Sequence, residues 1–349
     1  MYLLGAKSRY LKIKEYYQEV WNMNIRKNAL AALTGMAVGL GMTVGAMAAS
    51  WDMPTPYPDK TFHTQNIAIF AEDVAKATGG EVTIKIHSAG SLFKHPEIKN
   101  AVRGGQVPIG EFFVSLLSNE QAVFGADSQP FLATNYDEAK KLWDAQRPII
   151  TTLLDKEGLM PLFSVPWPPQ GLYTKKAINT VDDLKGIKFR AYNATLELFA
   201  NKIGAAPTQV EVPDIPQAFA TSQVEAMITS PSTGANSKAW DFVTHYTDIQ
   251  AWLPKNIVVV SKKAFRKLDE KTQQAILTAA KAAEDRGWEM SKKETSEQTA
   301  ILKENGIIVV TPSAELMAGL KEIGASMLES WKKDAGLEGA ELLKAYGVK

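Results

Sequence analysis

The sequence predicts an α/β protein of two domains, and three observations support this prediction. Its 349 residues are enough for two domains of ordinary size with well-buried cores. Short apolar runs alternate with stretches of helical periodicity along the chain, which is typical of α/β domains. The sequence contains no low-complexity linker and no solenoid repeat. We therefore expect strands, rather than a loose tether, to cross between the domains.

The first half of the chain predicts helices that alternate with strands. Apolar side chains from 67 to 75 recur at helical spacing, and Gly79-Gly80 ends that helix. Residues 81–86 alternate between polar and apolar side chains, as in a strand. A helix over 96–102 stops at Gly104-Gly105. Further strands are predicted at 107–114, 159–165 and 171–175.

The second half continues this alternation and contains the longest predicted helix. Strands are predicted at 186–190, 224–229, 256–261 and 306–311. Helical segments are predicted at 181–184, 194–203, 215–222, 271–305, 314–333 and 338–346. The run 256–261 is apolar, as expected for a strand buried on both faces. Thirty residues of unbroken helix span about 45 Å, so the segment 271–305 is long enough to brace both domains.

The N-terminal region has the layout of a secretory signal peptide over 23–48. Arg26 and Lys27 form a basic region, residues 29–45 are uncharged and mostly apolar, and Ala46-Met47-Ala48 supplies a small-residue cleavage site. The alternative for this segment is a retained membrane anchor. Residues 1–22 are polar and are not needed by a signal peptide, so we interpret them as a mis-assigned leader that precedes the true start at Met23.

Composition excludes several classes of function. The whole chain has 39 basic and 38 acidic side chains, and removal of 1–48 leaves 33 and 36. A mildly acidic chain of this kind lacks the basic excess of a nucleic-acid or membrane-surface binder. The absence of cysteine excludes disulfides, thiolate zinc sites, iron–sulfur clusters and cysteine nucleophiles.

Catalytic motifs are also absent from the sequence. It contains no nucleophile elbow, no Walker A loop, no H-E-x-x-H zinc motif and no dinucleotide-binding glycine pattern. The four histidines are not at the spacing of metal ligands. We therefore expect a protein that is not an enzyme and that uses no cofactor and no metal.

Two places in the sequence suggest a binding site. Trp167 lies between prolines at the end of an apolar strand, where it is either a rigid pocket wall or a core residue beside an interdomain crossing. Arg190 ends the strand 186–190, and ligands bind at the carboxyl ends of strands in open α/β sheets. Its planar guanidinium suits a carboxylate. The residues alone favour an alternative, a surface salt bridge to Asp182 or Asp183.

A resemblance to a known protein family favours ligand binding by Arg190 over the salt bridge. Residues 176–193, which read KAINTVDDLKGIKFRAYN, resemble the signature of the periplasmic solute-binding proteins of TRAP transporters, the DctP type. Other similar blocks occur in the same order over nearly the whole chain after 48: 70–74 (FAEDV), 101–105 (AVRGG), 124–125 (FG), 129–132 (QPFL), 204–208 (GAAPT) and 222–226 (SQVEA).

The resemblance implies a two-lobed clamshell of α/β lobes, with strands crossing between the lobes and a long helix bridging them. On this basis we expect one lobe over 50–166 and 256–290, and the other over 167–255 and 291–349. The protein would act in the periplasm as a monomer, capture a small organic acid between the lobes, and deliver it to the small and large membrane subunits of the permease.

The resemblance also implies the binding residues. The family arginine that binds the substrate carboxylate corresponds to Arg190, while Gln170 and His95 stand where some members have further arginines. Ser230 stands where the family has a late pocket asparagine. The full set of expected ligand-binding residues is Arg190, Gln170, Asn193, Trp167, Glu111, His95, Ser230, Phe62 and Phe112.

Arg190 is the one cation expected in the binding site, which implies a ligand with one carboxylate. We expect a 2-keto, 2-hydroxy or aromatic monocarboxylate, with a sulfonate as a further possibility because guanidinium binds that group too. Two other classes remain as alternatives, an ABC-type periplasmic binding protein and an exported α/β hydrolase. The signature around Arg190 argues against the first, and the missing nucleophile argues against the second.

Overall fold

The protein is described by a computed structural model that covers residues 49–348. The expected leader (1–22) and signal peptide (23–48) lie outside the described residues. Among residues 49–348, no helix is both long enough and apolar enough to cross a membrane.

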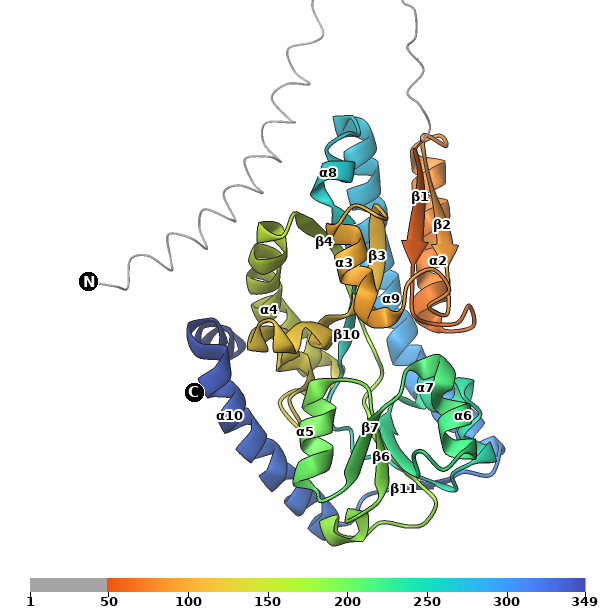
Figure 1. Ribbon diagram of the computed structural model, residues 1–349, viewed down its shortest axis with the longest axis vertical. Helices are drawn as coiled ribbons and strands as arrows, with labels where there is room; N and C mark the ends of the chain where they lie inside the picture. Colours follow the sequence, from red (N-terminus) through yellow and green to blue (C-terminus); the bar gives the residue numbers. More distant parts are fainter. Residues whose placement is uncertain (1–48, 349) are drawn as a thin grey trace, which may run out of the picture. The chain divides into compact units, whose positions relative to one another are not determined.

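The strands of the described residues form three sheets (Figure 1). Two sheets belong to one lobe, here called the first lobe: a parallel pair of β1 (Ala49–Pro54) and β2 (Val82–His87), and an antiparallel sheet in the order β3 (Ile109–Phe113), β10 (Lys255–Ser261), β4 (Leu159–Pro166). The third sheet is mixed and belongs to the second lobe, in the order β11 (Ile308–Val310), β9 (His245–Thr247), β5 (Gly171–Thr174), β8 (Ala226–Thr229), β6 (Lys188–Ala191), β7 (Ala206–Gln209).

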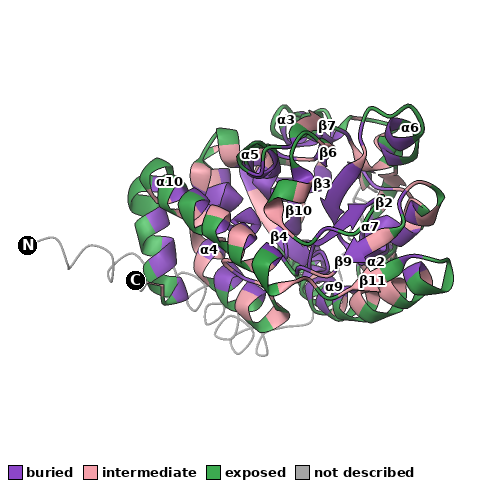
Figure 2. Cartoon of the chain, turned by 90° about the horizontal axis from the view of Figure 1, so that it is seen from below, coloured by how far each residue is buried: buried purple, intermediate pink, exposed green. Residues whose placement is uncertain are grey.

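Helices cover these sheets, and their outer faces are exposed while their inner faces are buried (Figure 2). The α-helices are α2 (Phe62–Ala77), α3 (Ile98–Arg103), α4 (Tyr136–Lys156), α5 (Ala194–Lys202), α6 (Ile215–Ala220), α7 (Pro231–Asn236), α8 (Lys262–Phe265), α9 (Glu270–Glu304) and α10 (Ala314–Tyr346). Short 3-10 helices are η1 (His95–Glu97), η2 (Val114–Asn119), η3 (Ala122–Ser128), η4 (Val181–Leu184), η5 (Val212–Asp214) and η6 (Ala239–Asp241).

Two segments cross between the lobes, as expected from the sequence. One leads from β4 to β5 and the other from β9 to β10, and they run side by side. The amide of Trp167 donates to the Pro254 carbonyl (2.8 Å), and Gln170 exchanges backbone hydrogen bonds with Trp252 (3.0 Å) and Ala251 (2.9 Å). These bonds give the crossing a defined geometry at the point where the lobes meet.

The long helix α9 contributes to the cores of both lobes. Ile276, Ala280 and Ala283 pack with α2 and the strands of the first lobe. Leu302, about five turns beyond Ala283, packs with Tyr173 and Tyr246 of the second-lobe sheet. The predicted bridging helix is therefore confirmed, whereas the residue boundaries expected for the two lobes stay a prediction.

The C-terminal helix differs from its prediction in one respect. The sequence predicts two helices, and the structure joins them into α10 across Gly336, whose backbone is non-helical (φ 54°, ψ −132°). Leu316 and Leu320 pack on the second-lobe core, while Trp331 and Leu342 pack with Leu142 of α4. The N-terminal part of α10 thus packs on the second lobe and its C-terminal part on the first lobe (Figure 1).

Candidate functional site

A cavity of about 370 Å³, measured out to the solvent at its mouth, lies where the two lobes and the crossing segments meet. The first lobe contributes Tyr57, His95 and Phe113. The crossing segments contribute Trp167, Gln170 and Pro254, and the second lobe contributes Arg190, Tyr192, Glu211, Val212, Thr229 and Thr233. This lining of aromatic side chains with a few polar groups is typical of a small-molecule site.

Arg190 is the buried cation of this cavity. It is the penultimate residue of β6, and only 1% of it is exposed. Its Nε donates to the Val210 carbonyl (2.9 Å), and its guanidinium lies over the Tyr192 ring, 4.9 Å from the centroid. Within residues 49–348 no carboxylate forms an ion pair with it, so the Nη groups remain available to an anion that enters the cavity.

The alternative salt bridge from Arg190 to Asp182 or Asp183 is wrong. Asp182 pairs with Lys185 (2.8 Å), and Asp183 accepts backbone hydrogen bonds from Asn179 (2.9 Å) and Thr180 (3.0 Å) at the start of η4. Both acids are used locally at the edge of the lobe. Burial lowers the pKa of Arg190, but an arginine stays charged at neutral pH. A buried cation without a protein partner is costly, and a bound anion would compensate its charge.

His95 and Glu211 form a second polar pair in the cavity, and its protonation follows from the hydrogen bonds. The backbone N–H of Phe113 donates to Nε2 of His95 (3.1 Å), so Nε2 carries no proton. The ring is therefore neutral with its proton on Nδ1, which donates to Oε2 of Glu211 (3.1 Å). Burial alone would raise the pKa of Glu211, but the hydrogen bond from His95 and the positive charge of Arg190 lower it. Glu211 is thus a carboxylate at neutral pH.

An aromatic wall closes the first-lobe side of the cavity. Tyr57 and Trp167 meet edge to face, with ring centroids 5.0 Å apart. Both are held by Oδ1 of Asn256, which accepts from the Tyr57 hydroxyl (3.1 Å) and from Nε1 of Trp167 (3.0 Å). The amide of Asn256 in turn donates to Oε1 of Glu111 (2.9 Å). The wall is therefore fixed from behind by a buried polar network.

Four of the nine expected site residues line the cavity: Arg190, Gln170, Trp167 and His95. The Gln170 side chain accepts from the Tyr192 hydroxyl (3.2 Å) and donates to the Pro168 carbonyl (2.8 Å). Glu111 and Phe62 lie behind the wall, with the Phe62 ring 5.5 Å from that of Trp167. They support the wall rather than line the cavity.

The other three expected residues lie outside the cavity lining. Phe112 faces a separate core with Ile257 and Trp288, because successive strand residues face opposite sides and Phe113 takes the cavity side. Ser230 is the N-cap of α7 and accepts from the Thr233 amide (3.1 Å). Asn193 lies at the interface between the lobes, where its side chain bonds to Ser115.

Asn193 connects α5 of the second lobe to the first lobe. Its Oδ1 caps α5 by accepting from the Leu196 amide (2.8 Å), and its Nδ2 donates to the Ser115 hydroxyl (2.7 Å). A weaker contact reaches Ser128 (3.5 Å), which bonds to Asp127. The Asn193 side chain is therefore part of the interface between the lobes and does not line the cavity.

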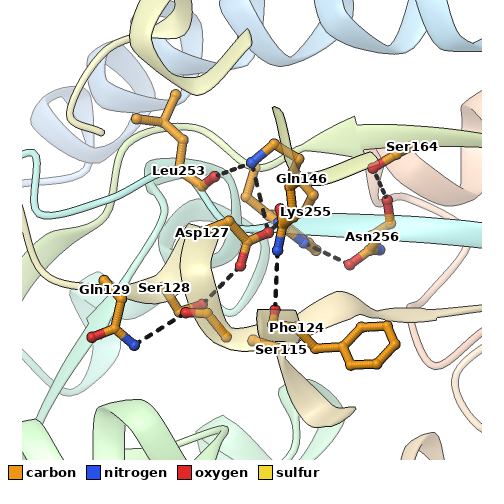
Figure 3. A network of polar contacts seen from close by, with 12 residues as sticks. Ser115, Phe124, Asp127, Ser128, Gln129, Gln146, Ser164, Leu253, Lys255 and Asn256 are labelled. Carbon is orange, nitrogen blue, oxygen red and sulfur yellow. Dashed lines mark hydrogen bonds and ion pairs between the residues drawn. The ribbon is translucent and has the colours of Figure 1, made fainter. Parts of the chain in front are cut away.

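Asp127 and Lys255 form a buried ion pair next to this interface (Figure 3). Neither side chain is exposed, and Oδ2 of Asp127 lies 3.6 Å from the ammonium nitrogen of Lys255 and 2.9 Å from its backbone N–H. The ammonium group also donates to the Leu253 carbonyl (3.4 Å). The pair fixes η3 to the start of β10, one residue before Asn256.

Several cavity residues are not predicted from the sequence: Tyr57, Phe113, Tyr192, Glu211, Val212, Thr229, Thr233 and Pro254. Glu211 follows the strand β7, and the rule that singles out Arg190 at a strand end applies to it as well. Across residues 49–348 no group of three or more His, Asp or Glu side chains is placed to hold a metal ion.

Comparison with known proteins identifies one family and several solved relatives. The model of bacterial extracellular solute-binding protein family 7 (DctP) matches residues 55–334. The chain is 45% identical to DctP7 and 42% identical to DctP6, two Bordetella pertussis extracytoplasmic solute receptors whose structures bind pyroglutamic acid. It covers 99% of each, with 86% and 85% of this chain aligned and TM-scores of 0.85 and 0.84.

A third similar structure comes from a marine metagenome. It is a TRAP solute-binding protein specific for pyroglutamate, with 39% identity and a TM-score of 0.84. The alignment covers 86% of this chain and 99% of that one.

Proposed function

Because the chain belongs to family 7 of the bacterial extracellular solute-binding proteins, the solute receptors of TRAP transporters that bind small organic acids, we propose that its ligand is pyroglutamate. Pyroglutamate is a five-membered lactam with one carboxylate. It is thus a cyclic monocarboxylate with an amide, rather than the 2-keto, 2-hydroxy or aromatic acid expected from the sequence.

The observation that carries this proposal is the buried, unpaired guanidinium of Arg190 in the interlobe cavity. Arg190 lines this cavity, and no carboxylate of residues 49–348 pairs with its Nη groups. A single carboxylate held by charge-assisted hydrogen bonds would compensate this charge. The aromatic wall of Tyr57 and Trp167 offers an apolar surface to a flat ring.

The single cation also favours a monocarboxylate over a dicarboxylate. Gln170, which stands where some members of the family have a second arginine, is neutral, and Glu211 adds a negative charge to the cavity. A second ligand carboxylate would face that negative charge without a compensating cation. Three solved relatives at 39–45% identity bind pyroglutamate, which supports the same ligand here.

The role that follows is capture and delivery without chemistry. The receptor would bind its ligand in the periplasm after cleavage of the signal peptide and pass it to the small and large permease subunits as a monomer. It would use neither metal nor cofactor, because charge compensation and shape are sufficient for this task.

A thermal-shift screen of the purified protein, freed of carried-over ligand by dialysis, tests this function. Pyroglutamate should raise the melting temperature, because a ligand that binds only the folded state adds about 2.7 kcal/mol at 100 times its dissociation constant. Succinate, lactate and glutamate should raise it far less. No shift with pyroglutamate, together with a large shift for another acid in the screen, would replace the proposed ligand.

A further inference from the structure

Glu211 has one carboxylate oxygen that the protein does not use. Its Oε2 accepts from Nδ1 of His95 (3.1 Å). Among the described residues, no donor bonds to its Oε1. Glu211 lines the cavity and is 29% exposed, so this oxygen can meet a ligand.

The surroundings fix Glu211 as an acceptor. The backbone N–H of Phe113 holds His95 in the tautomer with its proton on Nδ1, so His95 can only donate to Glu211. Because Glu211 is ionised, it has no proton of its own to offer. The hydrogen bonds that run from the Phe113 backbone through His95 to Glu211 therefore leave Oε1 of Glu211 as a free acceptor in the cavity.

Arg190 presents the opposite chemistry in the same cavity. Its guanidinium offers only donors, and no direct ion pair joins it to Glu211 in the part of the chain that the structure describes. A ligand that lies between the two groups must therefore offer an acceptor to Arg190 and a donor to Glu211. A carboxylate with an N–H on the neighbouring carbon offers both within one small unit.

We propose that Glu211 is a specificity-determining residue that accepts a hydrogen bond from an N–H group next to the ligand carboxylate. The site then selects α-amido acids, of which a lactam is the compact cyclic form, over acids of equal shape that lack the N–H. This inference rests on the proposed function, since it assumes that Arg190 holds the carboxylate of a ligand in this cavity.

The sharpest test compares pyroglutamate with its lactone analogue, 5-oxotetrahydrofuran-2-carboxylate, by titration calorimetry. The two differ only in the ring N–H, which the lactone replaces with an oxygen. A hydrogen bond to a charged group contributes about 1.5–3 kcal/mol, which corresponds to a preference of about 10- to 150-fold for the lactam. In addition, the lone pairs of the lactone ring oxygen would face the Glu211 carboxylate and repel it.

The variant Glu211→Gln extends the test. His95 still donates to the amide oxygen of glutamine, so the NH₂ group turns toward the ligand and opposes the lactam N–H. Pyroglutamate binding should weaken about 10- to 150-fold, while the lactone should bind as in the wild type or more tightly. The matched control Glu197→Gln, on the exposed face of α5, should leave both affinities unchanged.

The outcomes separate this inference from the proposed function. Tight binding of pyroglutamate with equal affinity for the lactone in the wild-type protein overturns the role of Glu211 and leaves the ligand assignment intact. Unchanged lactam preference in Glu211→Gln does the same. Failure of the wild-type protein to bind pyroglutamate overturns the proposed function, and the inference falls with it.

Discussion

Glu111 is the buried acid behind the aromatic wall, and only 2% of it is exposed. The Thr55 hydroxyl bonds to its Oε2 (2.5 Å) and the Asn256 amide to its Oε1 (2.9 Å). Burial raises the pKa of Glu111 from 4.5 to about 7, although both of these hydrogen bonds act in the opposite direction. The residue that supports the wall is therefore titrated near neutral pH.

We expect Glu111 to make folding stability fall as the pH rises from about 4.5 to 7. The folded state keeps the proton over this range while the unfolded state has lost it, so the free energy of unfolding decreases with pH. Glu111→Gln mimics the protonated acid and should be more stable than the wild type at pH 8 by up to about 3 kcal/mol. At pH 4.5 the two should differ little. Urea denaturation at both pH values measures this difference.

Comparison with the variant also removes the contribution of His63, whose pKa is lowered by burial. Glu72→Gln, on the exposed face of α2, serves as the control and should follow the wild type at every pH. An equal loss of stability with pH in Glu111→Gln and in the wild type would show that Glu111 is already ionised in the folded state.

At the scale of single residues, the sequence identified the anchor but not its surroundings. Arg190 could be predicted because a strand end, a charge and a family signature coincide there. Phe112 and Phe113 could not be told apart, because the face of a strand depends on its register against β10. Tyr57 comes from a loop whose path follows from tertiary packing, so its place in the cavity has no local signal. Glu211 follows β7, a strand that was not predicted, so the strand-end rule could not be applied to it.

At the scale of elements, the ion pair of Asp127 and Lys255 holds η3 against β10 (Figure 3). Both groups are fully buried, and burial raises the pKa of Asp127 and lowers that of Lys255 while their mutual attraction opposes both changes. Removal of one partner would leave an uncompensated charge in the interior.

Lys255→Met should therefore lower the free energy of unfolding by about 3–5 kcal/mol. The double variant Asp127→Asn/Lys255→Met should recover much of this loss, because it removes both charges. The control Lys262→Met breaks a more exposed pair with Asp155 and should cost about 1 kcal/mol or less. Equal stability of Lys255→Met and the wild type in urea denaturation would contradict a charged pair at this position.

Element prediction succeeded where periodicity was long and failed where it was interrupted. The helix expected over 271–305 is α9 (Glu270–Glu304), displaced by one residue. No helix is predicted at α4, although its buried residues recur at helical spacing, because Pro148 and several charges interrupt the pattern. The strands β1, β7 and β9 have three to six residues and gave too little pattern to be predicted.

At the scale of the whole molecule, ligand binding and lobe closure are expected to be coupled. The cavity takes its lining from both lobes, and Asn193 bonds to Ser115 across the interface. A ligand that contacts both lobes stabilises their approach, since a hinge can shift only by the difference in affinity between its open and closed forms.

Small-angle scattering should therefore give a smaller radius of gyration with saturating pyroglutamate than without ligand. Arg190→Ala at the same ligand concentration should keep the radius of the unliganded protein, because it no longer holds the carboxylate. The clamshell mechanism would be contradicted by an unchanged radius in a wild-type sample that calorimetry shows to be saturated.

Titration of pyroglutamate into the wild-type protein, Arg190→Lys and Arg190→Ala measures most directly whether this arginine holds the ligand carboxylate. Arg190→Ala leaves a buried anion unpaired, which costs about 2–5 kcal/mol and corresponds to a loss of roughly 30-fold to several thousand-fold in affinity. Arg190→Lys keeps the charge but loses the two-pronged geometry, so its affinity should lie between the two. The unliganded melting temperature of Arg190→Ala should stay close to that of the wild type, because the variant loses the hydrogen bond to the Val210 carbonyl but also removes an unpaired buried charge. Wild-type affinity in Arg190→Ala would contradict the assignment.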